Sequence, residues 1–182
     1  MPQNPKDPKT LFLAILGLAF LAFAAIMLVR TLSAPQIVDE SREITYDDFS
    51  YGVSGLRATT VLSSVSAPPG QAFYIFKARV TNHARGVDYK FKPEIFRLYT
   101  PDGKPLENAT AAQTALDASL GAPQMQEVSI GPQGESAGRE VVFLGPQGLS
   151  SVRVAISTAG WVGNVLDAVF GGNVNIEAKV GR

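Results

Sequence analysis

His83 is the only imidazole in the chain, and histidine is the side chain whose ordinary pKa lies closest to neutral pH. It follows Asn82 in the stretch TNHARG, at the end of a segment in which apolar and polar residues alternate. General-base catalysis would require a nucleophile and an orienting acid beside the imidazole, and the sequence does not place either there. We therefore interpret His83 as a solvated histidine in a turn.

Other arrangements that carry chemistry are missing from the sequence. H-E-x-x-H, C-x-x-C, G-x-S-x-G and P-loop patterns do not occur, and there is no cysteine to form a disulfide or bind a metal. The acidic residues between positions 39 and 48 lack the spacing of a calcium loop. We predict no catalytic, cofactor or metal site and a protein that is not an enzyme, with an enzyme as the least favoured alternative.

Four basic residues form a candidate interaction patch. Lys77 and Arg79 share one face of a predicted strand, and Lys90 and Lys92 share a face of the next. Together they could make a basic patch on one sheet for an acidic lipid, glycan or protein, and ordinary outer-face charge is the alternative. The whole chain carries 16 basic and 16 acidic side chains, a balance that argues against nucleic acid as a partner.

The N-terminal part of the sequence predicts a membrane anchor. Residues 11–29, LFLAILGLAFLAFAAIMLV, contain no charge, no proline and no hydrogen-bonding side chain. A helix of this length matches the roughly 30 Å hydrocarbon core of a bilayer. We predict a single transmembrane helix over 11–30, and a cleaved signal peptide is the alternative. Lys6 and Lys9 precede the run, so residues 1–10 are expected in the cytoplasm and the rest outside the cytoplasmic membrane.

Beyond this run the hydrophobic pattern changes to a period of two. We expect a linker or stalk over 31–50 and a β-domain over 51–182. The segments that alternate are FYIFKARVTN, VDYKFK, SVRVAIS and VNIEAKV, with turn sequences such as APPG and TPDGK before or after strands. In the first segment, Tyr74, Phe76, Ala78 and Val80 share the predicted core face. The pattern predicts a mainly β protein, an antiparallel β-sandwich of the immunoglobulin-like type.

Two segments predict short helices in loops. Residues 110–121 read as a helix that Thr110 caps and Gly121 terminates. Residues 161–172, WVGNVLDAVFGG, bring apolar side chains to one helical face, and four of them form a second candidate interaction patch: Trp161, Val165, Val169 and Phe170. This helix either closes an open end of the sandwich, which we favour, or presents the patch to a partner or the membrane surface.

The tetrapeptide Gly-Pro-Gln-Gly occurs twice, at 131–134 and 145–148. Val141, Val142, Phe143 and Leu144 lie between the copies and read as a buried strand. A phosphate-binding loop would require a following Lys-Ser/Thr and a helix, which the sequence lacks. We interpret the two copies as turns at the ends of one strand.

The order PPGQAFYIFKARVTNHA, FKPEIFRLYTPDGKPLE, IGPQGESAGREVVFLGPQG and VRVAIS resembles bacterial extracytoplasmic immunoglobulin-like domains of unknown function, including the mycobacterial immunoprotective-antigen type. The resemblance covers about residues 53–158. It rests on Val80-Thr81-Asn82, on the hairpin from Phe96 to Lys104 and on the segment from Pro132 to Pro146, where Gln133 separates the family's Pro-Gly pair. The resemblance implies a β-sandwich outside the cytoplasm and no catalytic residue.

Two functions agree with these features. We favour a single-pass protein whose extracytoplasmic immunoglobulin-like domain binds a protein or surface ligand, or acts as an accessory subunit. The alternative is a structural subunit whose anchor helix packs among the helices of a larger membrane complex.

The two interpretations of residues 161–172 predict different effects of mutation. If the helix closes the core, replacing Val165 and Val169 by Ser lowers the melting temperature, because apolar area is no longer removed from water. If the patch is exposed, stability stays the same and association with a partner or membrane weakens. We expect the first result in a thermal melt, and an unchanged melt with lost association would contradict it.

Overall fold

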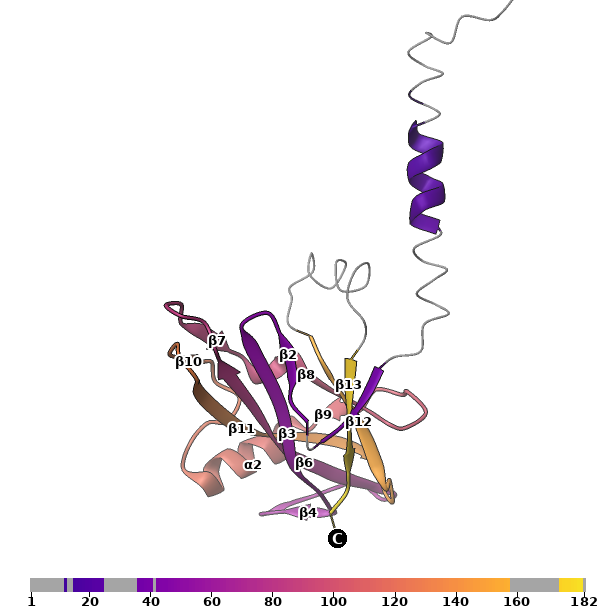
Figure 1. Ribbon diagram of the computed structural model, residues 1–182. Coiled ribbons are helices and arrows are strands. Elements are labelled where there is room, and N and C mark those ends of the chain that lie inside the picture. The colour runs from indigo at the N-terminus through magenta and orange to yellow at the C-terminus, as the bar shows by residue number, and fades with distance from the viewer. Residues whose placement is uncertain (1–11, 13–14, 25–35, 41, 158–173, 182) are drawn as a thin grey trace, which may run out of the picture.

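A five-stranded sheet and a four-stranded sheet pack face to face in the computed structural model (Figure 1). The structure describes residues 12, 15–24, 36–40, 42–157 and 174–181. The five-stranded sheet has the order β2-β3-β6-β11-β9. Its strands are β2 (Ile44–Tyr46), β3 (Phe49–Thr59), β6 (Gln71–Asn82), β9 (Glu107–Asn108) and β11 (Glu135–Pro146).

The four-stranded sheet has the order β1-β13-β12-β8. Its strands are β1 (Gln36–Asp39), β8 (Phe96–Tyr99), β12 (Ser151–Ile156) and β13 (Val174–Lys179). β1 pairs with β13 in parallel, so the prediction of a wholly antiparallel sandwich is wrong for this pair. β1 and β2 both lie in the range 31–50 that we expected to be a linker, and both take part in the sheets.

Shorter elements complete the described fold. β7 (Tyr89–Phe91) pairs with β10 (Val128–Ile130), and β4 (Val61–Leu62) pairs with β5 (Val65–Ser66). A 3₁₀ turn, η1 (Pro93–Ile95), precedes β8, and one α-helix, α2 (Thr110–Leu120), lies between β9 and β10.

The main core lies between the two large sheets. Phe76 and Phe143 come from neighbouring strands and stack with a centroid separation of 5.9 Å and an interplanar angle of 8°. Phe96 of β8 meets Phe76 edge-on from the opposite sheet, with a centroid separation of 6.2 Å. The predicted core face of β6 is confirmed, since Tyr74, Phe76, Ala78 and Val80 are all buried here.

Strand β6 is also buried on its other face along its first half. Phe73 and Ile75 point away from the main core and pack with Leu116 of α2 in a second apolar cluster. The prediction of one buried and one solvated face is therefore wrong for this half of β6 and right for the half that carries Lys77 and Arg79, which are exposed. The difference arises because α2 covers only the first half of the strand.

Helix α2 ends as the sequence predicts but begins differently. Gly121 adopts the left-handed conformation, with φ 67°, and its N–H bonds the carbonyl of Ala118, so it terminates the helix. Thr110 is already the first helical residue. The cap position belongs to Ala109, which has no side-chain hydrogen bond to offer, and the prediction of a Thr110 cap is therefore wrong.

The two Gly-Pro-Gln-Gly copies lie at the ends of β11, which confirms that they are turns. In the first copy Gln133 and Gly134 have positive φ, and their N–H groups bond the carbonyls of Ala84 and Asn82. In the second copy Gly148 has positive φ, and the N–H of Gln147 bonds the carbonyl of Gly70. The strand between them is longer than the four buried residues we predicted.

Asn82 explains one motif of the resemblance in structural terms. It is fully buried at the end of β6. Its Nδ2 donates to the carbonyls of Val87 and Ile130, at 2.8 and 3.1 Å, and its Oδ1 accepts the N–H of Ala84. One side chain thus joins β6, the loop after it and β10. Val87, the first residue of the alternating segment VDYKFK, lies before β7 and is exposed.

The described part of the predicted anchor, residues 12 and 15–24, is helical. Across the described residues, no helix reaches the length and apolar character needed to cross a membrane. The predicted helix at 161–172, with the patch of Trp161, Val165, Val169 and Phe170, lies outside the described residues.

The aromatic stack at the centre of the sandwich predicts a large stability loss on truncation. We expect Phe76→Ala or Phe143→Ala to lower the free energy of unfolding by about 3–5 kcal/mol, because each removes buried area and leaves a cavity. Chemical denaturation of the full chain in detergent measures the change. Val61→Ala, at a side chain that is 53% exposed, is the control and should change stability by less than about 0.5 kcal/mol. Equal midpoints for all three variants would show that the core is assigned to the wrong faces.

Candidate functional site

The four basic residues of the predicted patch do not lie on one sheet. Lys77 and Arg79 are on β6, on the outer face of the five-stranded sheet, whereas Lys90 is in β7 and Lys92 follows it. The expected arrangement of all four on one sheet is therefore not the one observed. Lys77 and Arg79 are both exposed, as the sequence pattern of β6 predicts, whereas Lys92 lies beyond the end of β7, which pairs with β10 and not with the five-stranded sheet.

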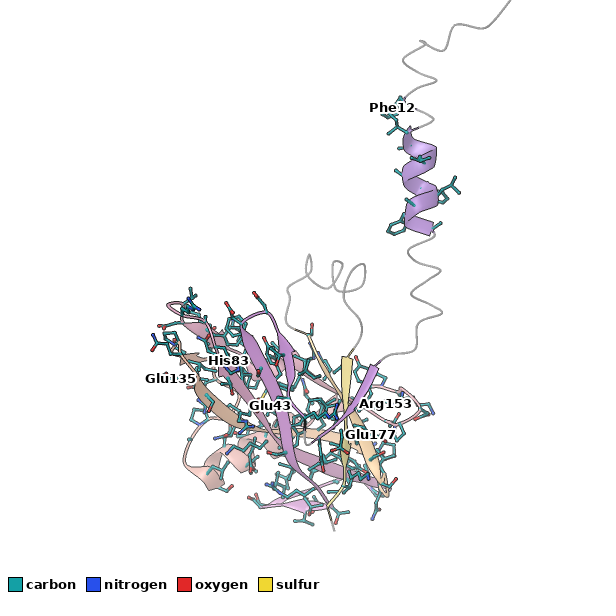
Figure 2. The ribbon with its side chains drawn as sticks, in the orientation of Figure 1. Phe12, Glu43, His83, Glu135, Arg153 and Glu177 are labelled. Carbon is teal, nitrogen blue, oxygen red and sulfur yellow. The ribbon has the colours of Figure 1, made fainter. Side chains whose placement is uncertain are left out.

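Three of these four cations already have a carboxylate partner. Arg79 pairs with Glu43, which precedes β2 and is labelled in Figure 2. Lys90 and Lys92 share Glu127, with Nζ–Oε distances of 3.5 and 3.2 Å. The hydrogen bond from Lys92 and the charge of Lys90 hold the pKa of Glu127 below its usual value. These surfaces therefore carry mixed charge and are less basic than the sequence pattern suggested.

His83 is exposed, as predicted, but it is not isolated. Its Nε2 lies 2.9 Å from the Oγ of Ser50, which is buried and is a further 3.1 Å from the Oγ1 of Thr45. A serine–histidine contact is part of a nucleophilic triad, which also needs a carboxylate on the second imidazole nitrogen. In the described part of the chain, no carboxylate forms an ion pair with His83. The contact joins β3 to the end of β6, and sequence reasoning missed it because 33 residues separate the two side chains.

Between α2 and β11 lies a notch, a cavity of about 260 Å³. Its lining combines apolar and polar residues. The apolar residues are Ala109, Met125, Val141 and Val142, and the polar residues are Asn108, Thr110, Gln113, Thr114 and Asp117. Small-molecule sites usually measure about 300–1,000 Å³, so this notch has room for a single side chain or a comparably small group.

Gln113, which lines the notch, hydrogen-bonds the open edge of β11. It is buried on the face of α2 that otherwise presents Ala112 and Leu116. Its Oε1 accepts the N–H of Val142 at 2.9 Å, and its Nε2 donates to the carbonyl of Glu140 at 3.1 Å. The side-chain amide thus forms the two bonds that a neighbouring strand would form. Gln124 caps the same edge of β11, because its Oε1 accepts the N–H of Glu140 at 3.1 Å.

Sequence reasoning did not find either glutamine. A signal was present, since Gln113 occupies a core-facing position of a helix whose other inward residues are apolar. A buried amide requires hydrogen-bond partners, but the sequence does not show which backbone groups supply them. Across the described residues, no group of three or more His, Cys, Asp or Glu side chains is placed to hold a metal ion.

A scan against protein-family models finds no match, and a search of curated proteins finds no relative. Solved structures do match. A secreted protein of Mycobacterium tuberculosis, MPT63, is 18% identical, with a TM-score of 0.50 over 81% of this chain and 98% of its own. A conserved hypothetical protein of Bacillus anthracis is 14% identical, with a TM-score of 0.52 over 70% of this chain and 93% of its own.

The third similar structure is the ycdA protein of Bacillus subtilis, which is named as a lipoprotein. It is 12% identical with a TM-score of 0.53 over 78% of this chain, and the chain spans 39% of its length. Likeness at these identities concerns the fold. The chain is a mainly β protein with the β-sandwich fold that these proteins share.

The hydrogen bonds of Gln113 predict a specific stability loss. We expect Gln113→Leu to lower the free energy of unfolding by about 1–3 kcal/mol for each backbone group left without a partner, namely the Val142 N–H and the Glu140 carbonyl. Urea denaturation measures the loss. Gln126→Leu makes the same replacement at an exposed glutamine and should change little. Equal losses for the two variants would show that the hydrogen bonds of Gln113 contribute nothing to the free energy of unfolding.

Proposed function

We propose that the chain is a membrane-anchored, extracytoplasmic immunoglobulin-like domain that binds a protein or a surface ligand and is not an enzyme. It acts as a binding or accessory module on the outer side of the cytoplasmic membrane. The proposal concerns three properties: the anchor, the location of the domain and the kind of activity.

The observation that carries the proposal is the exposed apolar surface of helical residues 15–24. Six large apolar side chains there are between 49% and 74% exposed: Ile15, Leu16, Leu18, Phe20, Leu21 and Phe23. Successive helical residues differ in direction by about 100°, so these six surround the helix instead of forming one stripe. A helix that is apolar on all sides requires an apolar environment, and a bilayer supplies one.

Three further features support the location and the activity. The uncharged run 11–29 follows Lys6 and Lys9, which favours a cytoplasmic N-terminus. Similar β-sandwiches occur in a secreted protein and in a protein named as a lipoprotein. The notch beside α2 is lined by both apolar side chains and hydrogen-bonding groups, which suits the capture of one side chain of a partner.

Protease accessibility tests the anchor and the orientation. We expect protease added to intact spheroplasts to degrade residues 31–182 and to leave a membrane-embedded fragment that contains residues 11–29. The same treatment after lysis, and a cytoplasmic protein that survives until lysis, are the controls. A domain that stays intact until the spheroplasts are lysed would contradict the orientation, and a domain released without protease would contradict the anchor.

Affinity purification in mild detergent distinguishes the binding module from a structural subunit of a membrane complex. A partner that the full chain retains and a Thr114→Trp variant loses supports the binding module, because the indole occupies the notch that Thr114 lines. Ser54→Trp, at an exposed position of β3, is the matched control. A stoichiometric integral-membrane partner retained by residues 1–35 alone would favour the structural subunit.

A further inference from the structure

One edge of strand β11 is open over part of its length. β11 pairs with β6 along all of Glu135–Pro146, but on its other side it pairs with β9 only at Phe143 and Leu144. Within the described residues, positions 135–142 therefore have no strand on that side. Figure 2 labels Glu135 at this margin of the sandwich.

The register identifies the backbone groups that point to the open edge. Gln147 donates to the carbonyl of Gly70, and the antiparallel register continues from this pair with every second residue bonded to β6. The odd-numbered residues of β11 therefore bond β6, and the even-numbered residues direct their N–H and C=O groups outward. Gln113 and Gln124 hydrogen-bond the backbone of Glu140 and Val142, which are even-numbered, and this agrees with the outward direction of the even-numbered groups.

The caps leave a short section of the edge free. Gln113, Gln124 and the N–H of Ala109 occupy the outward groups of Glu140 and Val142. Further along, the carbonyl of Gly138 accepts a bond of 3.1 Å from Nη1 of Arg139. The described residues give no partner to the outward N–H groups of Ser136 and Gly138.

Two opposite charges lie four residues apart on this section. Glu135 and Arg139 are both odd-numbered, so they extend from the same face of β11. The Nε of Arg139 is buried without a hydrogen-bond partner in the described part of the chain, and no described carboxylate pairs with it. Glu135 is exposed, and its Oε2 accepts the N–H of Gly131 at 2.8 Å, which leaves Oε1 available.

We propose that two copies of the chain associate edge to edge through residues 135–139 of β11, antiparallel about a two-fold axis at Ala137. In this register Ser136 faces Gly138 of the partner subunit, and each such pair exchanges two backbone hydrogen bonds. The Gly138 carbonyl, which already accepts from Arg139, has a second lone pair for this bond. Glu135 faces Arg139 of the partner subunit, and the symmetry repeats the ion pair. The association joins the two five-stranded sheets into one continuous sheet. The resulting dimer contains two notches, one from each copy.

The sequence Glu-Ser-Ala-Gly-Arg favours this register, and it favours a second copy of the chain as the partner strand. An axis at Ser136 or at Gly138 would place Arg139 opposite an uncharged residue, and a parallel arrangement in register would place like charges opposite each other, which destabilises a pair. An inward-pointing charge on an edge strand also disfavours unrelated strands. A second copy supplies the carboxylate at the required position, and the small side chains between the charges allow close approach.

The contact is small. Five residues from each copy bury less surface than a standard interface, which buries about 800 Å² per partner. We therefore expect a weak association that depends on concentration. A covalent trap is therefore the appropriate test. The chain contains no cysteine, so a single introduced thiol reports on a single position.

The first test uses Ala137→Cys in the full chain, purified in detergent. Ala137 faces its own copy as a non-hydrogen-bonded pair, whose Cα separation of about 4.5 Å lies within the range for a disulfide. Ser54→Cys, exposed on the outer face of the same sheet, is the matched control. Each oxidation rate is divided by the alkylation rate of the same thiol. We expect the normalised rate of dimer formation to be at least about tenfold higher for Ala137→Cys than for Ser54→Cys, because paired thiols react at a raised effective concentration. Equal normalised rates would overturn the proposal.

The second test exchanges the charges in the Ala137→Cys chain. Glu135→Arg alone or Arg139→Glu alone places like charges opposite each other and should reduce disulfide formation to the control rate. The two changes together reverse both ion pairs and should restore it. Arg139→Gln removes the attraction without adding repulsion and should give an intermediate rate, and melting curves check that each variant is folded. Failure of the double exchange to restore the rate, with all variants folded, would overturn the proposed register.

Discussion

The rest of the structure depends on strand β6, which is hydrogen-bonded on both edges and buried on both faces along its first half. On the inner side Phe76 stacks on Phe143 of β11 and meets Phe96 from the opposite sheet. On the outer side Phe73 and Ile75 require a separate cover. Both large sheets and helix α2, which covers the outer side, are positioned by the need to remove these side chains from water.

Helix α2 meets that need, and its position has consequences for the edge of the sheet. Leu116 and Ala112 lie over Phe73 and Ile75, and this brings Gln113 to the backbone of β11. The glutamine satisfies outward N–H and C=O groups that would otherwise be buried without partners. The notch arises at the same place because β9 contains only two residues and ends before α2 begins. A covering helix, a closed edge and a candidate ligand cavity thus share one cause.

Where α2 does not reach, β6 and its neighbours present polar side chains. Arg79 pairs with Glu43, and Arg57 of β3 pairs with Glu140 of β11 at 2.9 Å across this face. Exposed ion pairs of this kind contribute little stability, so this surface is free to change without loss of the fold. The edge at residues 135–139 differs from it, because Arg139 has a buried donor without a partner among the described residues. This contrast distinguishes the solvated face from the edge through which we propose that two copies associate.

The sequence by itself determined the features that depend on neighbouring residues. Alternation along β6, β12 and β13 reveals their inward faces. Gly121 ends α2, and the two Gly-Pro-Gln-Gly copies mark the ends of β11. These features are readable because local conformation and side-chain direction follow from short-range geometry. The β-sandwich class follows from the same patterns. Only the tertiary structure decided which outer positions α2 covers, which carboxylate meets Lys92, and which backbone groups Gln113 caps. Each of these depends on contacts between residues distant in the chain, whose positions are set by packing of the whole core and not by any local pattern.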